Sequence, residues 1–434
     1  MGIQKNIRYP AYLQEAFDFP EFFRIKMSYP RPQIGDLGQA VQNAVRFQLE
    51  KVGIKPGDKV CVGVGSRGIQ GISEIVALVC SEIRGAGGDP FIMPAMGSHG
   101  GGTPDGQVSV LERMGVTEEI CGCPVLSTLD VQQVDTVLGE VPVYYAKDAL
   151  AADHAICINR IKPHTKFKGS VESGVMKMLC IGMGKHEGAL SYHTWALKYG
   201  FYRLLNEMGN SVCRNSNFRF GIGVVENAYD ETMIIEGLGR DELIQREEAL
   251  LKIAKENMPH LPVREVDALI VNEIGKEFSG AGLDPNITGR ATDLMEDDFS
   301  ANFKASRLAV LNLSAKSKGN ALGIGNADII TEKVFDAIDY EATLMNVLTS
   351  FSLKKAAIPV MMPTDEKAIQ AALLTLGPVP SDQIRVIIIR NTLELSECWV
   401  SQGLIDEIRL DPMIEVLEQK ALTFDSAGNL TLFS

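Results

Sequence analysis

The sequence predicts an α/β protein of two domains, with mostly parallel sheets and an active-site cleft between the domains. The first observation is the length, because 434 residues correspond to two or three domains of ordinary size. The second is that short β-branched runs alternate with amphipathic segments, as in the β-α-β units of parallel sheets. This alternation starts afresh after a Pro-containing linker at 258–262, so the domains are expected at 1–262 and 263–434.

The first domain opens with a helix over 36–52, where Leu37, Val41 and Val45 recur at helical spacing. A Pro-Gly turn leads into a β-α-β unit with a strand at 59–64, a helix at 71–84 and a strand at 90–96. The other elements expected here are strands at 141–146, 155–161 and 218–225 and a charged helix at 240–257.

The second domain is expected to close the substrate cleft. Its core strands are predicted at 268–274, 308–313 and 385–389, with helices such as 366–376 between them. Its last ~25 residues are expected to pack back on the first domain.

Composition excludes several classes of protein. The 42 Lys and Arg against 55 Asp and Glu give a formal net charge of −13, which repels nucleic acids and anionic membrane surfaces. We find no apolar run long enough to span a bilayer and no secretory signal, and therefore expect a cytoplasmic protein. The eight cysteines lie in mostly apolar surroundings and are expected to be packed and reduced. Cys121-Gly-Cys123 is too tightly spaced for a zinc knuckle.

Two glycine-rich loops follow the strands of the β-α-β unit. The first, at 63–68, has the G-x-G-x-x-G pattern of a dinucleotide-binding loop. The next strand ends without the acidic residue that would hold a ribose, so NAD binding is the weaker interpretation. Arg67 lies inside this turn, where its guanidinium is expected to bind a substrate carboxylate through two hydrogen bonds. The alternative is an arginine that only caps the sheet edge in solvent.

The second loop, Met96-Gly-Ser-His-Gly-Gly-Gly-Thr103, places His99 in a turn after the neighbouring strand. Three consecutive glycines remove side chains where something bulky must approach the backbone. His99 is therefore expected beside Arg67. His164 likewise follows the strand at 155–161, and two histidines at strand ends with an arginine suggest acid/base chemistry on an anion. His154 is assigned to the surface and His260 to the linker, so neither is a candidate.

Lys177 lies in an apolar run, between Met176 and Met178. Such a lysine either extends its ammonium to solvent or serves as a nucleophile or a covalent attachment point. If 186–200 is helical, His186 and His193 are about 10.5 Å apart along the axis, too far to share one metal ion. Either histidine alone is still able to act as a single ligand.

The series Gly-Ser-His99, Pro163-His164, Lys177 and His193 resembles the nickel-dependent lactate racemase family, over nearly the whole chain. Members of that family carry a nickel-pincer nucleotide, a pyridinium mononucleotide whose nickel is held by two sulfurs and one carbon of the cofactor. The stretch from Lys177 to His193 is the most specific part of the resemblance.

The resemblance implies a role for each of these residues. It implies a thioamide bond between the cofactor and Lys177, contacts of the cofactor with Ser173 and Gly174, and nickel ligation by His193. It further implies that His99 and His164 are the general acid/base residues and that Arg67 contacts the substrate.

The chemistry of a 2-hydroxy acid agrees with these roles. Removing the Cα proton would build a dianion beside a carboxylate, whereas removing hydride requires a base for the hydroxyl proton, a hydride acceptor and a cation for the carboxylate. The product is a mirror image, so a base is needed for each of two substrate poses. Nickel with sulfur and carbon donors prefers square-planar geometry, which one imidazole completes.

The chain departs from the family's lactate enzymes in three places. They carry a carboxylate shortly before the position of Arg67 and a basic residue after the first histidine, where this chain has glycines. Third, residues 278–290 stand where those lactate enzymes carry a Tyr-Gln and Lys cluster. We therefore predict a substrate larger than lactate, such as a sugar acid. Lys276 and Arg290 are candidates for substrate contacts from the second domain, and the alternative is a turn with both side chains in solvent.

The expected protein is thus an isomerase, a racemase or 2-epimerase of 2-hydroxy acids, loaded by cofactor-synthesis enzymes and with a homo-oligomer possible. One alternative is a nicotinamide-dependent oxidoreductase. The other is a non-catalytic binding protein for sugar acids or for the cofactor.

Overall fold

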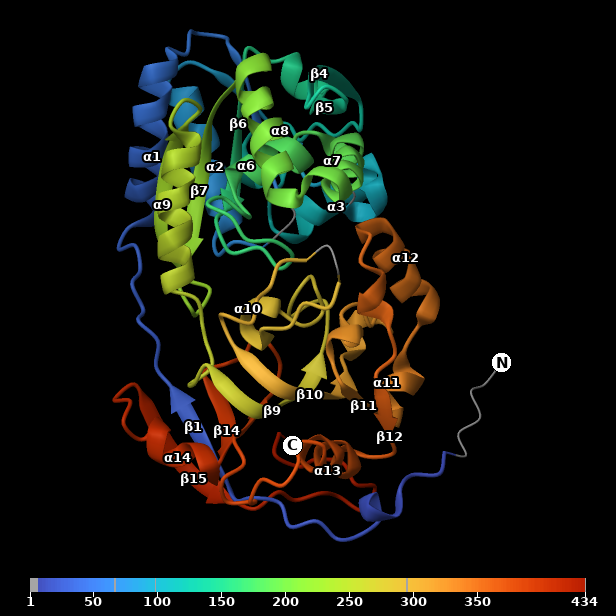
Figure 1. The fold of residues 1–434 in the computed structure, drawn as a ribbon. Coiled ribbons are helices and arrows are strands. Elements are labelled where there is room, and N and C mark those ends of the chain that lie inside the picture. The colour runs from blue at the N-terminus through green and yellow to red at the C-terminus, as the bar shows by residue number, and fades with distance from the viewer. Residues whose placement is uncertain (1–6, 66–67, 98, 294–295, 434) are drawn as a thin grey trace. The chain divides into compact units, whose positions relative to one another are not determined.

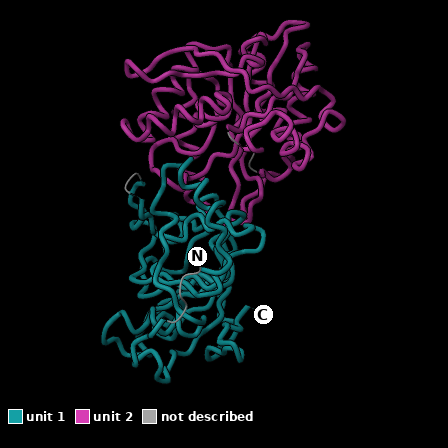
Figure 2. Tube along the Cα trace, turned by 90° about the vertical axis from the view of Figure 1, so that its right-hand side faces the viewer, with its two compact units in different colours: residues 1–29, 259–434 teal, residues 30–258 magenta. Residues whose placement is uncertain are grey.

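The computed structural model describes residues 7–65, 68–97, 99–293 and 296–433, and the chain divides into two compact units (Figure 2). Unit 2 is Pro30–Met258, and unit 1 combines the described residues up to Tyr29 with those from Pro259 onward. Each unit contains a mostly parallel sheet with helices on it, which confirms the predicted α/β class with mostly parallel sheets (Figure 1).

The sheet of unit 2 has the strand order β3-β2-β6-β7-β8. The first four are parallel and β8 is antiparallel. The strands are β2 (Lys59–Val64), β3 (Asp89–Pro94), β6 (His154–Arg160), β7 (Phe218–Glu226) and β8 (Thr232–Gly239). A separate two-stranded sheet contains β4 (Val131–Val137) and β5 (Val141–Ala146).

Helices cover both faces of this sheet. On one face, α1 and α2 pack against Val60, Val62 and Ile158 in one apolar core. On the other face, the β7 glycines Gly221 and Gly223 lie against side chains of α6 and α9. The helices of unit 2 are α1 (Leu37–Val52), α2 (Ile72–Gly85), α3 (Pro104–Arg113), α4 (Glu118–Cys121), α5 (Lys147–Leu150), α6 (Val175–Lys177), α7 (Lys185–Tyr199), α8 (Phe201–Asn215) and α9 (Leu243–Glu256).

The sheet of unit 1 has the order β12-β11-β10-β9-β13-β14-β1-β15, with five parallel strands followed by three antiparallel ones. These strands are β1 (Phe22–Met27), β9 (Glu265–Ile274), β10 (Lys304–Leu313), β11 (Ile329–Thr331), β12 (Val360–Met362), β13 (Val386–Ile389), β14 (Glu397–Ser401) and β15 (Ile414–Lys420). The helices are α10 (Pro285–Thr288), α11 (Glu332–Ala337), α12 (Tyr340–Ser350), α13 (Asp365–Leu374) and α14 (Gln402–Ile408).

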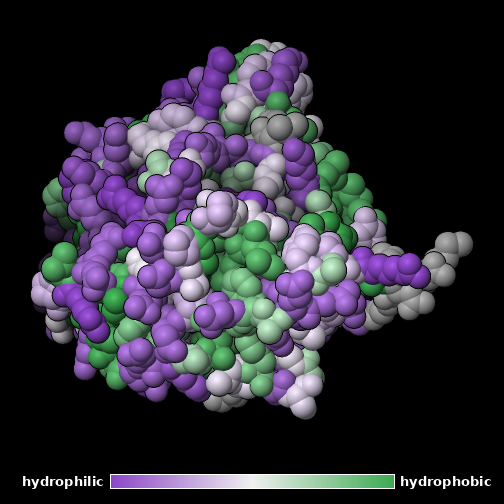
Figure 3. Space-filling model, turned by 60° about the horizontal axis from the view of Figure 1, so that its bottom comes forward, coloured by the Kyte–Doolittle hydropathy of each residue, from purple (hydrophilic) through white to green (hydrophobic). Residues whose placement is uncertain are grey.

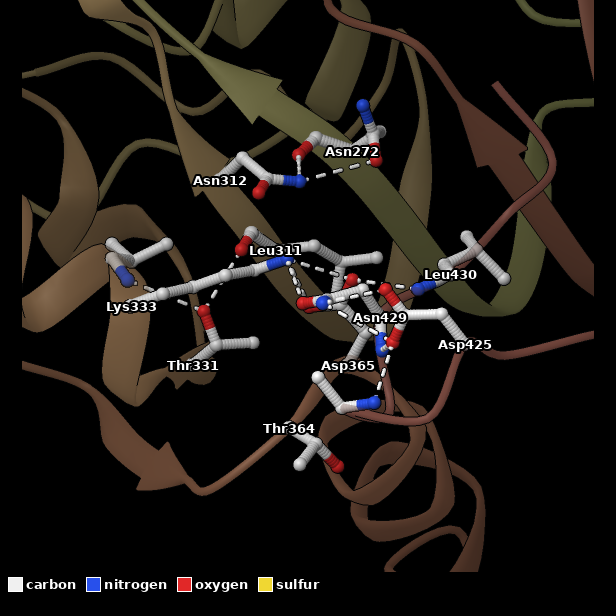
Figure 4. Close-up of polar contacts among 12 residues, drawn as sticks. Asn272, Leu311, Asn312, Thr331, Lys333, Thr364, Asp365, Asp425, Asn429 and Leu430 are labelled. Atoms are coloured by element: carbon white, nitrogen blue, oxygen red, sulfur yellow. Dashed lines mark hydrogen bonds and ion pairs between the residues drawn. The ribbon is translucent and has the colours of Figure 1, made fainter. Parts of the chain in front are cut away.

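The chain ends differ from the expected domain assignment. Residues 22–27 lie in the segment that was expected in the first domain, yet they form β1, which pairs with β14 and β15 inside unit 1. The C-terminal segment also lies in unit 1, where the Lys333 ammonium lies 2.8 Å from Oδ1 of buried Asp365 (Figure 4). Asp365 also accepts a hydrogen bond from the peptide N–H of Leu430 (2.9 Å), and Lys333 donates to the Asn429 side chain (3.0 Å). These contacts fasten the C-terminal segment to α11 and α13.

Two further expectations concern the cysteines and the membrane. All eight cysteines are buried and none forms a disulfide, which confirms that they are packed. Among the described residues, no helix has both the length and the apolar character needed to cross a bilayer. The face drawn in Figure 3 mixes hydrophilic and hydrophobic residues.

Candidate active site

Three loops of unit 2 start at the same edge of its sheet. Because β3, β2 and β6 are neighbouring parallel strands, their carboxyl ends lie side by side. The loop after β3 carries His99, which is exposed, and the loop after β6 carries His164, which is half-buried. Arg67 follows β2 and lies outside the described residues.

The first glycine loop has a packing reason for its glycines. A Cβ atom at Gly63 would lie 2.5 Å from Sδ of Met183, and one at Gly65 would lie 2.7 Å from Cε of Met178. These glycines therefore let the π-helical turn Met178–Gly182 approach the sheet edge directly after Lys177. The same close approach in a dinucleotide fold serves a pyrophosphate, so the glycine pattern here needs no NAD to explain it.

The second glycine loop also has a local explanation. Gly100, Gly101 and Gly102 all have positive φ, a conformation that L side chains rarely adopt. A Cβ at Gly100 would lie 2.4 Å from the backbone of Gly106 in the first turn of α3. Backbone geometry thus accounts for all three glycines, and at Gly101 it acts through φ alone, because a Cβ there would meet nothing within 4 Å.

His164 and Lys177 form a contacting pair. Nζ of Lys177, the last residue of α6, lies 2.8 Å from Nε2 of His164. The peptide N–H of Lys166 donates to Nδ1 of the same imidazole (3.1 Å). The Phe167 ring packs on the imidazole at a centroid distance of 4.4 Å. The fold therefore brings together two residues that are 13 positions apart in the sequence.

Ser173 and Gly174 connect the loop after β6 to α6. Ser173 pairs with Lys162 through two backbone hydrogen bonds, and the carbonyl of Gly174 accepts a bond from the Asn159 amide (2.7 Å). A Cβ at Gly174 would lie 2.2 Å from the carboxylate of Glu247, so only glycine leaves room for that carboxylate. Both residues thus lie directly before Lys177, in the segment that positions it.

Glu247 is a residue that the sequence analysis missed. Its carboxylate on α9 is fully buried and accepts a hydrogen bond from the peptide N–H of Met176 (3.0 Å). Burial raises the pKa of Glu247 to about 7, and the backbone N–H groups of α6 partly oppose this rise. The helical spacing could have indicated its burial, because Glu247 lies four residues after Leu243 and three before Leu250, on the buried face of α9.

His193 has the properties of a metal ligand. It lies on α7, and its Nδ1 is buried without a hydrogen-bond partner in the described part of the chain. Burial, together with the charges of Lys166 and Lys177, lowers the pKa of His193 to about 4. The imidazole is therefore neutral at physiological pH, the form that binds metals. His186 lies exposed in the first turn of the same helix.

The described residues contain one candidate imidazole ligand and no complete set of metal ligands. Across residues 7–65, 68–97, 99–293 and 296–433, no three His, Cys, Asp or Glu side chains cluster as a metal site. A metal whose other donors come from an organic cofactor requires a single protein ligand, and His193 fits that requirement.

The second-domain candidates have partners within unit 1. The guanidinium of Arg290 pairs with Asp328 (2.8 Å) and donates to the carbonyls of Ala305 (2.9 Å) and Ser306 (3.1 Å). The Lys276 ammonium donates to the side-chain oxygen of Asn346. Arg290 therefore has a structural role in its own unit, and its contact with a substrate stays a prediction.

Comparison with solved structures places the chain in the class of proteins that have the fold of lactate racemases. One such structure is that of the lactate racemase apoprotein from Thermoanaerobacterium thermosaccharolyticum, with a TM-score of 0.52 and 12% sequence identity. The match covers 86% of this chain and 99% of that one, so the likeness extends over both units. No protein-family model and no curated protein matches the sequence.

Proposed function

We propose that the protein is a racemase or 2-epimerase of 2-hydroxy acids that carries a nickel-pincer nucleotide on Lys177. The observation that carries this proposal is the contact of 2.8 Å between Lys177 and His164. The charge of Lys177 also acts on His193, whose buried Nδ1 has no hydrogen-bond partner among the described residues. The lactate racemase fold supports the proposal at the level of the reaction class.

The residues of this chain divide the chemistry among themselves. Nζ of Lys177 is the atom to which the cofactor is attached, and the neutral imidazole of His193 donates its lone pair to nickel. When bound, the nucleotide supplies a reversible acceptor for the hydride that leaves the substrate carbon. His164 and His99 take the hydroxyl proton from the two mirror-image poses and return it, and Arg67 binds the carboxylate.

The proposal extends to a substrate larger than lactate, such as a sugar acid. The glycine that follows His99 supports it, because the lactate enzymes of the resembled family carry a basic residue there and this chain has no side chain at that position. The test is a comparison of turnover for lactate and for longer polyhydroxy acids. Faster turnover of lactate than of every longer acid would refute this extension.

The central experiment uses protein produced together with the cofactor-synthesis enzymes. We expect intact mass and peptide mapping to place the modification on Lys177, one nickel per modified chain, and inversion of an α-deuterated 2-hydroxy acid with the deuterium retained. The matched control is Lys177→Arg, which keeps a cation but lacks the attachment amine. Activity with an unmodified Lys177, or complete exchange of the deuterium with water, would overturn the proposal.

A further inference from the structure

The first turn of α7 packs on the loop that carries His99. The Lys185 ammonium is fully buried and donates a hydrogen bond to the carbonyl of Pro94, the last residue of β3 (2.7 Å). One helical turn further along, a Cβ atom at Gly97 would lie 3.2 Å from the Cβ of Ala189. These two contacts fix the start of α7 against the end of β3, where the loop to His99 begins.

His186, the second residue of α7, lies beside the same loop. It is exposed, and its Nδ1 would lie 3.8 Å from a Cβ atom at Gly102. The peptide N–H of Gly102 donates to the carbonyl of His99 (3.2 Å), so this glycine closes the turn that begins at the candidate acid/base residue. The glycines at 100–102 carry no side chain, and an imidazole from α7 lies next to their turn instead.

His186 is also on the face of α7 that carries His193. Residues seven positions apart lie two turns apart on one side of a helix, about 10.5 Å along its axis. The charges of Lys166 and Lys177 act on His193 at one end of this face. At the other end, His186 lies beside the loop that carries His99. The face therefore extends from the candidate nickel ligand to one of the two candidate acid/base residues.

The length of this face distinguishes short substrates from long ones. An extended carbon chain advances roughly 1.2 Å per bond, so lactate spans roughly 2.5 Å between its end carbons and a six-carbon acid roughly 6 Å. A hydrogen bond adds about 3 Å at the far end. The six-carbon acid therefore covers most of the axial separation between His193 and His186, whereas lactate covers about half of it.

We propose that His186 is a specificity-determining residue, which forms a hydrogen bond with a hydroxyl group on the far part of a polyhydroxy 2-hydroxy acid. An imidazole suits this role, because one nitrogen of the neutral ring donates and the other accepts, as a hydroxyl group also does. The inference rests on the proposed function and narrows its substrate class to sugar acids of about six carbons.

The kinetic experiment compares the loaded wild type with His186→Ala and His186→Gln, on gluconate and on lactate. Loss of one hydrogen bond to the substrate should lower kcat/KM for gluconate roughly 5- to 10-fold in His186→Ala, mostly through KM. Lactate should change less than about two-fold, because it ends before the ring. The glutamine amide also donates and accepts, so His186→Gln should recover part of the loss. An equal loss for both acids, or no loss for gluconate, would overturn the proposal.

The matched control is Glu187→Ala, at the next exposed position of α7, about 100° further around the helix. This variant should match the wild type on both acids, and a loss equal to that of His186→Ala would contradict the role of His186. All three variants change an exposed residue, so the midpoint of urea unfolding should stay in place. Nickel content should also stay unchanged. Loss of nickel in His186→Ala would overturn the proposal, because the ring would then hold the cofactor rather than the substrate.

A titration followed by NMR tests the same contact without measuring turnover. Histidine is labelled with 15N in the ring of the full-length, loaded protein, and His186→Gln identifies the His186 signals by their loss. We expect gluconate to shift these signals and lactate to leave them in place. His154, which lies at the amino end of β6 and is held by Asp58 (3.1 Å) and Arg219 (3.0 Å), should move with neither acid. Unmoved His186 signals in gluconate would overturn the proposal.

The proposed function and the role of His186 fail in different ways. A loaded wild type that racemises no 2-hydroxy acid would refute the proposed function, and the titration would still decide whether His186 contacts a polyhydroxy acid. A loaded wild type that racemises gluconate, with the same kinetics in His186→Ala, would refute the role of His186 alone.

Discussion

Burial of Glu247 should make the stability of unit 2 depend on pH. Its pKa of about 7 in the folded protein compares with an ordinary value of 4.5, and this difference corresponds to about 3 kcal/mol. Because the folded-state pKa is the higher one, the folded protein binds the proton more tightly than the unfolded chain. The stabilising contribution is therefore complete below about pH 4.5 and is lost as the pH rises through about 7.

The perturbation is Glu247→Gln, which removes the charge and keeps a carbonyl oxygen for the peptide N–H of Met176. We expect the free energy of unfolding of the wild type to fall by about 3 kcal/mol, relative to the variant, between about pH 4.5 and pH 8.5. At the acid end both side chains are neutral in the folded state, so the two proteins should differ by less than about 1 kcal/mol.

The assay is urea unfolding at several pH values, followed by tryptophan fluorescence. The chain has two tryptophans, Trp195 in unit 2 and Trp399 in unit 1, so a Trp399→Phe background reports on unit 2 alone. Parallel stability curves of wild type and Glu247→Gln across this pH range would refute the reasoning. They would mean that the carboxylate stays ionised in the folded state.

Three further predictions concern other parts of the molecule. Arg290→Ala should lower the free energy of unfolding of unit 1 by roughly 2 kcal/mol in urea, because the ion pair with Asp328 and two hydrogen bonds to carbonyls are lost. The control Lys276→Ala should cost less than about 1 kcal/mol. Equal costs would contradict the structural role of Arg290. His193→Ala should abolish nickel retention in the loaded protein. It should change the free energy of unfolding of unit 2 by less than about 1 kcal/mol, because the buried Nδ1 has no hydrogen-bond partner among the described residues. Unchanged nickel content would exclude His193 as the ligand. A thiol reagent should modify fewer than about one of the eight cysteines in the native protein and all eight after denaturation, and rapid labelling of several would contradict their burial.

Much of the fold follows from local patterns. The strand predicted at 59–64 coincides with β2, and the helix predicted at 71–84 differs from α2 by one residue at each end. Both segments have a regular apolar period and clear turn signals on either side. Strand β1 was not predicted, because its partners β14 and β15 lie at the far end of the chain and no local signal announces such a pairing.

The glycine loops show where a local pattern misleads. Gly63 and Gly65 fit a dinucleotide motif, yet their neighbours in space are Met183 and Met178. A glycine indicates only that some group approaches the backbone closely, and it does not show whether that group is a ligand or a side chain of the protein. The three glycines after His99 have the same ambiguity, and positive φ angles account for them.

Local sequence patterns were enough to predict the α/β class and the strand ends that carry His99 and His164. They also predicted the separation of His186 from His193 along one helix. These features depend on the apolar period and on turn residues, which act over a few positions of the chain. Only the tertiary structure decided that Lys177 contacts His164 and that Glu247 holds the segment before Lys177. The same is true of the buried Nδ1 of His193, which has no hydrogen-bond partner among the described residues. Burial and hydrogen bonding set these properties, and both arise from residues that meet only after the chain has folded.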